Sequence, residues 1–408
     1  MSAYAVLRLP DFRFFMLARV CITVAIQIQA VVVGWQIYEI TKDPLSLGLI
    51  GLAEAIPAIT VALYAGHLAD ITERKKIILS CASLLVLCSL ALFYFTMKAS
   101  TLIALFGVVP IYSVIFVTGL ARGFLQPANF SFMPQLVPRE LYTNAIAWYS
   151  TLWEVASVLG PALGGYLIKL FGVQVSYVAV CAMMLLGLFF YAMVTSKPLP
   201  AISEEQGMIE KIKAGLKFVF HNQIVLSAMS LDLFAVLFGG AVALLPIFAT
   251  DILNVGSEGF GLLRAAPGVG AIGMAFYLIH NPIKKNIGKV LLWSVAGFGF
   301  CMIGFGASNL FWLSFALLVC SGMFDSVSVI IRGILIHTGT PENMKGRVAA
   351  VNSIFVGSSN EIGAFESGVV AKLMGVVNSV VFGGIMTLLV VGVTAKKADQ
   401  LVKLEKAG

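Results

Sequence analysis

Long apolar segments, separated by short polar breaks, follow one another along this whole sequence. A helix needs about 20 mostly apolar residues to cross the hydrocarbon core of a bilayer. Segments of this length in one chain cross as helices, because barrel strands are only about 9 to 11 residues long. The sequence therefore predicts an all-α integral membrane protein with twelve transmembrane helices, over residues 12–40, 44–70, 76–96, 101–126, 140–171, 174–196, 221–251, 257–280, 288–307, 309–337, 345–373 and 374–395.

The composition agrees with a membrane location. Hydrophobic residues make up 59% of the chain and charged residues 12%, which leaves too little polar surface to cover a soluble globule. The formal net charge of +7 would suggest a nucleic-acid partner in a soluble protein, but in a membrane protein basic residues gather in cytoplasmic loops. We therefore expect the lipid bilayer as a partner and no nucleic acid.

The distribution of Lys and Arg between the loops predicts the orientation. With the N-terminus in the cytoplasm, most of the 27 basic residues fall in cytoplasmic segments, as the positive-inside rule requires. The outer segments hold only Lys42, Lys98, Lys169 and Lys372. Twelve spans return the C-terminus to the cytoplasm, so both termini are expected there.

The longest polar break divides the spans six and six. It predicts an N-terminal six-helix bundle over 1–196, a cytoplasmic linker over 197–220 and a C-terminal six-helix bundle over 221–408. Apolar residues fall near helical spacing within the linker, among lysines, which is typical of a helix that lies in the membrane interface. These apolar residues are Ile209, Ile212, Leu216 and Val219.

An internal repeat relates the two halves. Residues 137–173 align with residues 340–376 at a constant offset of 203, and the identical pairs include Gly160/Gly363, Gly165/Gly368, Lys169/Lys372 and Gly172/Gly375. Two parallel six-helix repeats form an architecture in which a central site between the repeats changes its exposure from one side of the membrane to the other.

Several ionisable residues fall inside the predicted spans. Each costs several kcal/mol in the bilayer unless it is paired or hydrated, so each is a functional candidate. The acids outnumber the bases, and a surplus carboxylate that takes up and releases protons is what a proton-coupled carrier requires. The candidates for proton coupling or substrate binding are Glu54, Asp232 and Glu361, which lead, together with Asp325 and Glu154.

The basic residues inside the spans have two interpretations. Arg19, Arg264 and Arg332 either neutralise the buried acids or bind an anionic substrate. Asp325 and Arg332 lie seven residues apart, on one face of a helix, so a structural ion pair is the alternative for these two. Arg122 is expected at the cytoplasmic end of its helix.

Aromatic residues suggest the kind of solute, and missing motifs exclude other functions. Trp35, Gln36, Tyr38, Trp148, Tyr149 and Trp153 would suit a cavity for a ring-bearing solute, although anchoring at the membrane interface explains Trp35 and Tyr38 equally well.

We find no phosphate-binding Gly-Lys-Ser loop, no metal-ligand spacing and no nucleophile with a base, so neither ATP drive, a metal site nor an enzyme is expected.

Charged residues crowd into "GHLADITERKKIIL", residues 66–79. This segment resembles the signature loop of the major facilitator superfamily, and the resemblance covers essentially the whole chain. It implies that Gly66, Asp70, Arg74 and Lys75 form a cytoplasmic latch between helix ends. Two positions depart from the family pattern, since Ile71 replaces a basic residue and Glu73 replaces glycine.

The segment "ASVLGPALGG", residues 156–165, is similar to the motif of exporters in this superfamily. Gly160, Pro161, Gly164 and Gly165 match the motif, while Ala156 replaces its first glycine. A purely structural interpretation is also open, because small residues let helices approach closely and proline bends a span.

Other runs, such as "VVVGWQIYEIT" and "GRVAAVNSIFVGSSNEIGAFESG", resemble bacterial drug and siderophore exporters of the superfamily. The resemblance implies a monomeric carrier of the bacterial inner membrane that exports a siderophore or hydrophobic drug. It implies a proton gradient as the energy source and no cofactor. Multidrug efflux, metal-ion efflux and metabolite uptake are the alternatives.

Overall fold

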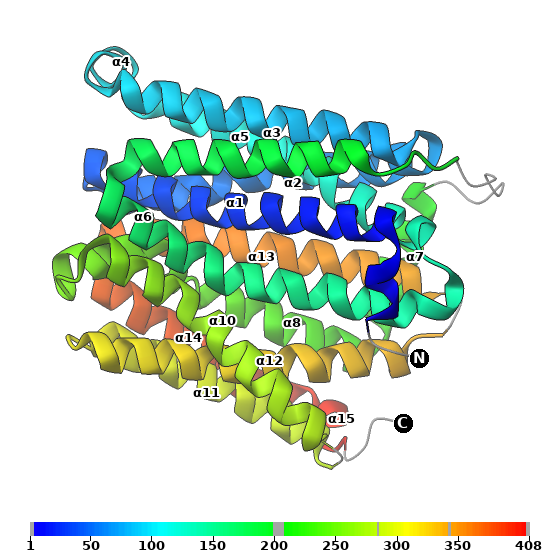
Figure 1. The fold of residues 1–408 in the computed structure, drawn as a ribbon. Coiled ribbons are helices and arrows are strands. Elements are labelled where there is room, and N and C mark those ends of the chain that lie inside the picture. The colour runs from blue at the N-terminus through cyan, green and yellow to red at the C-terminus, as the bar shows by residue number, and fades with distance from the viewer. Residues whose placement is uncertain (1–3, 199–207, 284, 342–343, 405–408) are drawn as a thin grey trace. The chain divides into compact units, whose positions relative to one another are not determined.

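The computed structural model describes residues 4–198, 208–283, 285–341 and 344–404, and the regular elements in these ranges are all helices (Figure 1). Backbone contacts divide the chain into two compact units. Unit 1 comprises Met1–Lys42, Ala53–Glu204 and Gly256–Ala265, and unit 2 comprises Asp43–Leu52, Glu205–Val255 and Ala266–Gly408.

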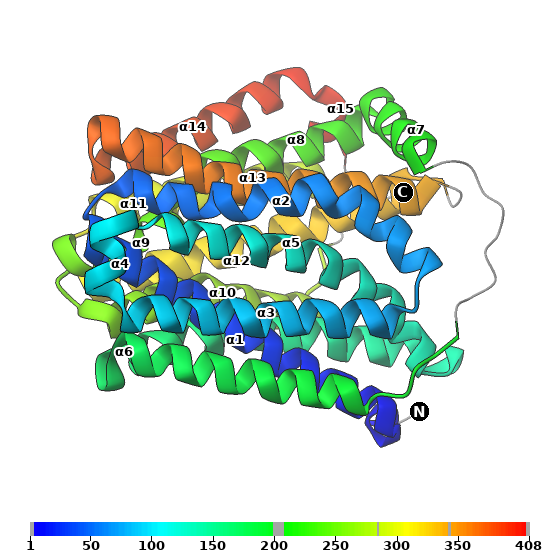
Figure 2. The same cartoon turned by 90° about the horizontal axis from the view of Figure 1, so that it is seen from above.

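The α-helices of unit 1 are α1 (Pro10–Thr41), most of α2 (Pro44–Ile71), α3 (Arg74–Met97), the short α4 (Ala99–Phe106), α5 (Val109–Phe132) and α6 (Tyr142–Met193). Short 3-10 turns, η1 (Ala5–Arg8), η2 (Met133–Leu136) and η3 (Arg139–Leu141), lie before and between them. α1 and α6 lie side by side in both views (Figure 1 and Figure 2).

Unit 2 contains α7 (Met208–His221), α8 (Gln223–Phe238), η4 (Ala241–Leu244), α9 (Leu245–Ile247), η5 (Phe248–Ile252), most of α10 (Gly256–His280), α11 (Ile287–Ala307), α12 (Phe311–Gly339), α13 (Lys345–Met374), α14 (Val376–Lys397) and α15 (Asp399–Val402). α8 packs against α13 and α14, and α11 packs against α12 and α14.

The twelve predicted spans correspond to these helices. Ten helical segments among the described residues are long and apolar enough to cross a membrane. One of them includes all of α6, which contains two predicted spans joined at Gly172, where φ is +78°. The twelfth span is α13, which has 30 residues but a more polar composition.

Gly172 in unit 1 and Gly375 in unit 2 are aligned in the repeat and have the same unusual backbone. Gly375 has φ of +91° and separates α13 from α14 as Gly172 separates the two parts of α6. A residue with a Cβ is strained at such φ values, so glycine is the residue that fits both turns. The repeat seen in the sequence is therefore a repeat of backbone structure.

Two further aligned pairs make equivalent contacts. Lys169 forms an ion pair with Glu258 in unit 1, and Lys372 forms one with Asp43 in unit 2, with 2.9 Å between Nζ and Oδ2. Lys169 and Lys372 each lie one helical turn after an aligned glycine, Gly165 and Gly368. Gly165 packs on the backbone of Gly261, and Gly368 packs on that of Gly48.

Buried polar side chains join three helices of unit 1. Ser89 of α3 donates a hydrogen bond of 2.9 Å to Gln29 of α1. The amide of Gln36 donates to Thr96 Oγ1 of α3 and its oxygen accepts from Tyr177 of α6, at 2.9 and 2.8 Å. Hydrogen bonds of this kind stabilise helix contacts in a bilayer, where apolar burial gives little preference.

The predicted linker helix is α7, whose described C-terminal part packs on other helices of unit 2. Val219 is fully buried in a cluster with Val225, Met229 and Ile336, and Leu216 packs against the same cluster. The side chains of Ile209 and Ile212 lie outside the described residues. α7 therefore contacts protein through at least part of its apolar face.

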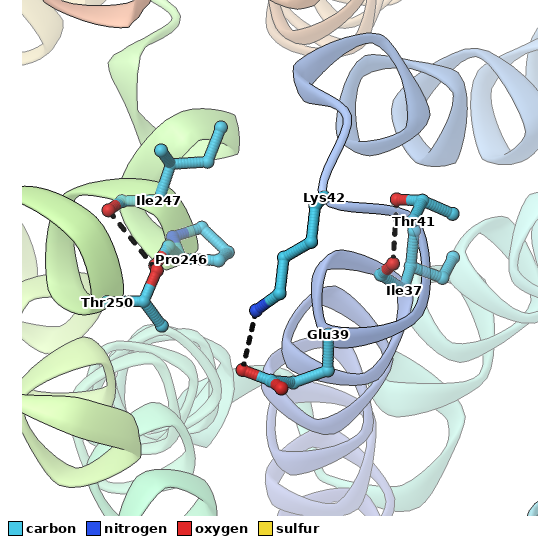
Figure 3. Close-up of polar contacts among 7 residues, drawn as sticks. All are labelled: Ile37, Glu39, Thr41, Lys42, Pro246, Ile247 and Thr250. Carbon is cyan, nitrogen blue, oxygen red and sulfur yellow. Dashed lines mark hydrogen bonds and ion pairs between the residues drawn. The ribbon is translucent and has the colours of Figure 1, made fainter.

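The span at 223–252 is discontinuous. α8 ends at Phe238, a 3-10 turn follows, and residues Phe248–Ile252 form a π-helical turn. The hydroxyl of Thr250 donates to the backbone oxygens of Pro246 and Ile247, at 3.0 and 3.4 Å (Figure 3). π turns often occur at functional sites within helices.

We predict that Gly368→Leu destabilises the protein, whereas Gly357→Leu on the same helix does not. A Cβ at Gly368 would lie 2.9 Å from Gly48 Cα, while a Cβ at Gly357 meets nothing within 4 Å. Overpacking costs about 1–3 kcal/mol. Thermal unfolding of the purified variants in detergent measures the difference, and equal midpoints for both variants would contradict the close contact of Gly368 with Gly48.

Candidate functional site

A cavity of 190 Å³ lies within unit 1 and is lined by residues of α1 and α6. α6 contributes Tyr149, Ser150, Trp153 and Glu154, whose spacing places them on one face of a helix. α1 contributes Arg19. The cavity therefore combines a base, an acid, a hydroxyl and two aromatic rings.

Close packing of α6 on α1 accompanies this cavity. A Cβ at Gly160 would lie 2.4 Å from Gln27 Cβ, and a Cβ at Gly164 would lie 3.1 Å from Val31 Cβ. These two glycines of the predicted exporter motif therefore let the helices approach each other closely. Gly165 and Pro161 contact the beginning of α10 instead, because a Cβ at Gly261 would lie 2.5 Å from the Pro161 oxygen.

The guanidinium group of Arg19 is the main electrostatic feature of the cavity. It lies over the ring of Tyr149, which attracts a cation through the negative face of the ring. Its Nη1 atom is buried and has no hydrogen-bond partner among the described residues. A buried donor without a partner is costly, so the site favours a ligand that accepts a hydrogen bond.

Glu154 lines the same cavity, and no ion pair joins it to Arg19 within the described part of the chain. Trp153, which also lines the cavity, is 47% exposed. An aromatic ring beside both an acid and a base can contact a ring-bearing solute that carries a charge of either sign.

Glu54, a predicted proton or substrate group, forms an ion pair with Arg122 of α5. The position of Arg122 was predicted wrongly. It lies inside α5 and not at the end of the helix, and the pair with Glu54 explains how the bilayer interior tolerates it. The pair is partly exposed, with 21% and 32% of the two side chains accessible.

Asp232 of α8 forms an ion pair with Arg332 of α12 in unit 2, and each residue is 5% exposed. The sequence offered Asp325, on the same helix, as the partner of Arg332. The structure adds a partner from another helix, which sequence spacing within one helix does not reveal. Asp325 lies next to this pair, along the wall of a small cavity that includes Asp232.

Glu361 and Arg264, the remaining predicted charges, are both partly buried and both have partners. Glu361 packs on the beginning of α2, within unit 2, because a Cβ at Gly51 would lie 3.2 Å from Glu361 Oε2. Arg264 falls in unit 1 and Glu361 in unit 2. The described contacts place Glu54 with Arg122, Arg19 in one cavity with Glu154, and Asp232 with Arg332 beside Asp325.

The predicted latch lies at the end of α2 and the start of α3. Arg74 donates through Nε to the oxygen of Ala69, at 3.2 Å, and Lys75 donates to the oxygen of Ala192, at 2.9 Å. Gly66 and Asp70 are in α2, and the side chain of Asp70 lies outside the described residues. The two basic residues thus bind carbonyl oxygens at nearby helix ends of unit 1.

Some residues that matter at these sites were missed in the sequence. Ser294 of α11 and Ser328 of α12 line the small cavity beside Asp232. Serines are common in transmembrane helices, so no pattern distinguishes these two from the others. Ser328 lies three residues after Asp325 and four before Arg332, and this shared helical face was the one available signal.

We predict that Arg332→Leu lowers thermal stability strongly, because it leaves Asp232 buried without its partner. Removing one member of a buried pair costs about 3–5 kcal/mol, whereas removing both is often close to neutral. The double variant Asp232→Leu/Arg332→Leu should therefore regain most of the loss. Lys169→Leu, which removes an exposed partner, is the control and should change the unfolding midpoint little.

Comparison with known proteins shows which family and which transporters this chain is similar to. Residues 1–407 match the family described as transmembrane secretion effector. The enterobactin exporter EntS of Shigella boydii serotype 18 is 27% identical over 394 residues, which cover 94% of this chain and 90% of that protein. EntS of Salmonella typhi is 26% identical over 400 residues, with 94% and 92% covered.

Solved structures show the same fold at low sequence identity. A bacterial homologue of the iron transporter ferroportin, in an inward-facing state, matches with a TM-score of 0.73 and 14% identity over 97% of this chain and 99% of that chain. A D-xylose-proton symporter matches with a TM-score of 0.70 and 13% identity over 98% and 99%. The chain thus belongs to the transmembrane secretion effector family of the major facilitator superfamily, and it is a membrane transporter, not an enzyme.

Proposed function

We propose that this transporter exports a small organic molecule, a siderophore or hydrophobic drug, in exchange for protons. It works as a monomer in the bacterial inner membrane, with both termini in the cytoplasm and no cofactor. The observation that carries this proposal is the unit 1 cavity, where Arg19 and Glu154 flank aromatic residues.

The chemistry of the cavity supports a ring-bearing anion as the first substrate class. Arg19 has a buried donor without a partner, and Trp153 offers an exposed ring beside it. A catecholate siderophore has both an aromatic ring and oxygen atoms that accept hydrogen bonds. The names of the EntS relatives agree with this class, because both are enterobactin exporters.

Glu154 is the acid we propose for proton exchange. Glu54 and Asp232 are held in ion pairs with arginines, and each would have to break its pair to gain a proton. Glu154 faces a cavity and makes no ion pair with Arg19, so a proton can reach its carboxyl group from water in the cavity. Glu361 and Asp325 remain candidates for a second proton site.

The domain organisation is part of the proposal. Residues 1–196 and 221–408 act as two six-helix bundles that expose the cavity first to one side of the membrane and then to the other. Arg74 and Lys75, together with Gly66 and Asp70, act as the latch at the cytoplasmic side. The hydrogen bonds of Arg74 and Lys75 to helix-end oxygens support this role.

A multidrug substrate is the second candidate, because Glu154 beside Trp153 also suits a hydrophobic cation. Metal-ion efflux has less support, since the described residues contain no group of three or more metal-ligating side chains. Purified protein in liposomes with an imposed pH gradient tests these candidates. The assay follows a catecholate siderophore and a cationic dye, with protein-free vesicles as the reference.

Siderophore flux that disappears with the gradient supports the proposal. Flux of the dye alone would move the substrate class to multidrug efflux. If neither compound moves under any gradient, the proposed substrates are wrong. In expressing cells, greater accumulation of the substrate would indicate uptake and would contradict export.

We predict that Arg19→Gln raises the KM for an anionic substrate at least tenfold while Arg13→Gln does not. A hydrogen bond to a charged group contributes about 1.5–3 kcal/mol, which corresponds to roughly a tenfold change or more. Arg13 is exposed on the same helix and is the matched control. Arg19→Lys should recover part of the affinity. An unchanged KM in Arg19→Gln would exclude this residue from substrate binding.

We also predict that Glu154→Gln makes transport insensitive to the pH gradient but leaves substrate exchange intact. The amide keeps the size of the side chain and cannot release a proton at neutral pH. Gradient-driven flux and substrate counterflow are measured in the same liposomes. Glu140→Gln, at an exposed position before α6, is the control and should behave like the wild type. Gradient-driven flux that persists in Glu154→Gln would assign the proton to another acid.

A further inference from the structure

Two cysteines lie on neighbouring helices of unit 2. All six cysteines of the chain belong to the described residues, and each is a free thiol there. Cys301 is buried on α11, and Cys320 is exposed on α12. α11 and α12 follow each other in the chain and pack against each other. The arrangement of these two helices therefore decides whether the two thiols can meet.

Two glycine contacts fix the register of α11 against α12. A Cβ at Gly304 of α11 would lie 3.2 Å from Leu317 Cδ1 of α12, and a Cβ at Gly297 would lie 2.7 Å from Phe324 Cε1. The first contact is later on α11 and earlier on α12 than the second, so the two helices run antiparallel. Glycine at both contacts lets the two helices approach each other closely.

This register brings the two cysteines opposite each other, between the two glycine contacts. Along α11, Cys301 is three residues from the first contact and four from the second. Along α12, Cys320 is likewise three residues from the first contact and four from the second. Side chains three and four residues apart share one face of a helix. The two thiols therefore lie at the same level of the interface, and they interact electrostatically.

Contacts with other helices agree with this orientation. Gly299, Ile303 and Gly306 of α11 contact α14, and their helical positions form a different face from that of the cysteine. Val319 and Gly322 of α12 contact α10. The faces that pack on α14 and α10 are thus separate from the faces that carry the two cysteines.

The surface beside Cys320 is apolar. Leu313 and Ala316 precede it at helical spacing on α12, and both are exposed. Phe300, next to Cys301 on α11, is also exposed, whereas Cys301 itself is 7% exposed. Apolar side chains are those that the hydrocarbon core favours on a spanning helix. An apolar reagent can therefore reach the first thiol, while the second is covered.

We propose that Cys301 and Cys320 form a thiol pair that an apolar alkyl hydroperoxide oxidises to a disulfide bond between α11 and α12. An exposed thiol beside a second cysteine that resolves it is typical of redox-sensitive sites. A disulfide needs Cα atoms within about 7 Å of each other, and the close glycine contacts on both sides favour this approach. The pair lies in unit 2 and the proposed substrate cavity in unit 1, so this inference does not depend on the proposed export.

The reaction has two steps. In the first, the sulfur of Cys320 attacks the terminal oxygen of the hydroperoxide. A sulfur–oxygen bond forms, the oxygen–oxygen bond breaks, and the alkoxide leaves with the thiol proton as an alcohol. In the second, the sulfur of Cys301 attacks that of Cys320, the sulfur–oxygen bond breaks, and the hydroxyl leaves with the other thiol proton as water. The thiol pair loses two electrons, and the hydroperoxide gains them.

Treatment of the purified full-length protein in lipid nanodiscs with cumene hydroperoxide tests this inference. Free thiols are then alkylated with a maleimide in denaturant and counted by intact mass, before and after reduction with dithiothreitol. The variants are Cys301→Ser and Cys320→Ser. Cys181→Ser is the matched control, because Cys181 is as buried as Cys301 but lies in unit 1.

We expect the wild type to lose two of its six reactive thiols and to regain both on reduction. Cys181→Ser should also lose two thiols. Cys320→Ser should lose none, because the attacking sulfur is missing. Cys301→Ser should stop at a sulfenic acid on Cys320, which dimedone traps. An independent measurement, the rise in unfolding midpoint on oxidation, should appear in the wild type and not in Cys301→Ser, because a disulfide restricts the unfolded chain.

Retention of all six thiols in the folded wild type would overturn the inference, and so would equal loss of thiols in Cys320→Ser and the wild type. A disulfide between two copies of the chain, seen as a dimer on a non-reducing gel, would also contradict a pair within one chain. The assay includes no transport step, so its failure would leave the proposed export unaffected. Failure of export in liposomes would likewise leave the thiol pair unaffected.

Discussion

The cost of placing a charge in the hydrocarbon core governs the internal structure of this protein. Glu54 and Arg122, and Asp232 and Arg332, come from different helices, and each pair neutralises charges that neither helix could carry alone. Arg19 achieves the same in part through the ring of Tyr149. A helix that carries one of these charges therefore needs a particular neighbouring helix, as well as enough length to cross the bilayer.

The internal repeat gives both units the same means of helix contact. A glycine of α6 and the aligned glycine of α13 each approach another backbone closely, and the lysine one turn later forms an ion pair. The units differ in their charged interiors. Unit 1 has an open cavity with a base and an acid, whereas unit 2 has a tightly buried pair beside a cavity of atomic size. A shared framework thus carries two different kinds of site.

Apolar segment length and loop charge were sufficient to predict the all-α fold, because the bilayer allows few alternatives. The repeat also aligned Gly172 with Gly375, and the structure shows that both have positive φ. The partner of Arg332 was not predictable in the same way. Spacing along one helix identified Asp325, while the contact with Asp232 depends on how α8 packs against α12.

Residue type alone also gave wrong or missing predictions at single positions. Arg122 was expected at the cytoplasmic end of a span over 101–126, whereas α5 extends to Phe132 and Glu54 pairs with Arg122 inside it. Ser294 gave no signal, since a serine in a span is most often bonded to its own helix, and Ser328 gave only its position on the helical face of Asp325 and Arg332. Ser294 is indeed bonded in this way, whereas the Oγ of Ser328 has no hydrogen-bond partner among the described residues.

The break after α8 has a mechanical consequence. A rotation about Gly239 and Gly240 would move the part that contains the π turn at Phe248–Ile252 without turning the α-helical part that contains Asp232. A continuous helix would transmit such a rotation along its whole length and would pull Asp232 away from Arg332. Because the α-helix stops at Phe238, a bend after that residue would leave the helical segment that carries Asp232, and its pair with Arg332, unchanged.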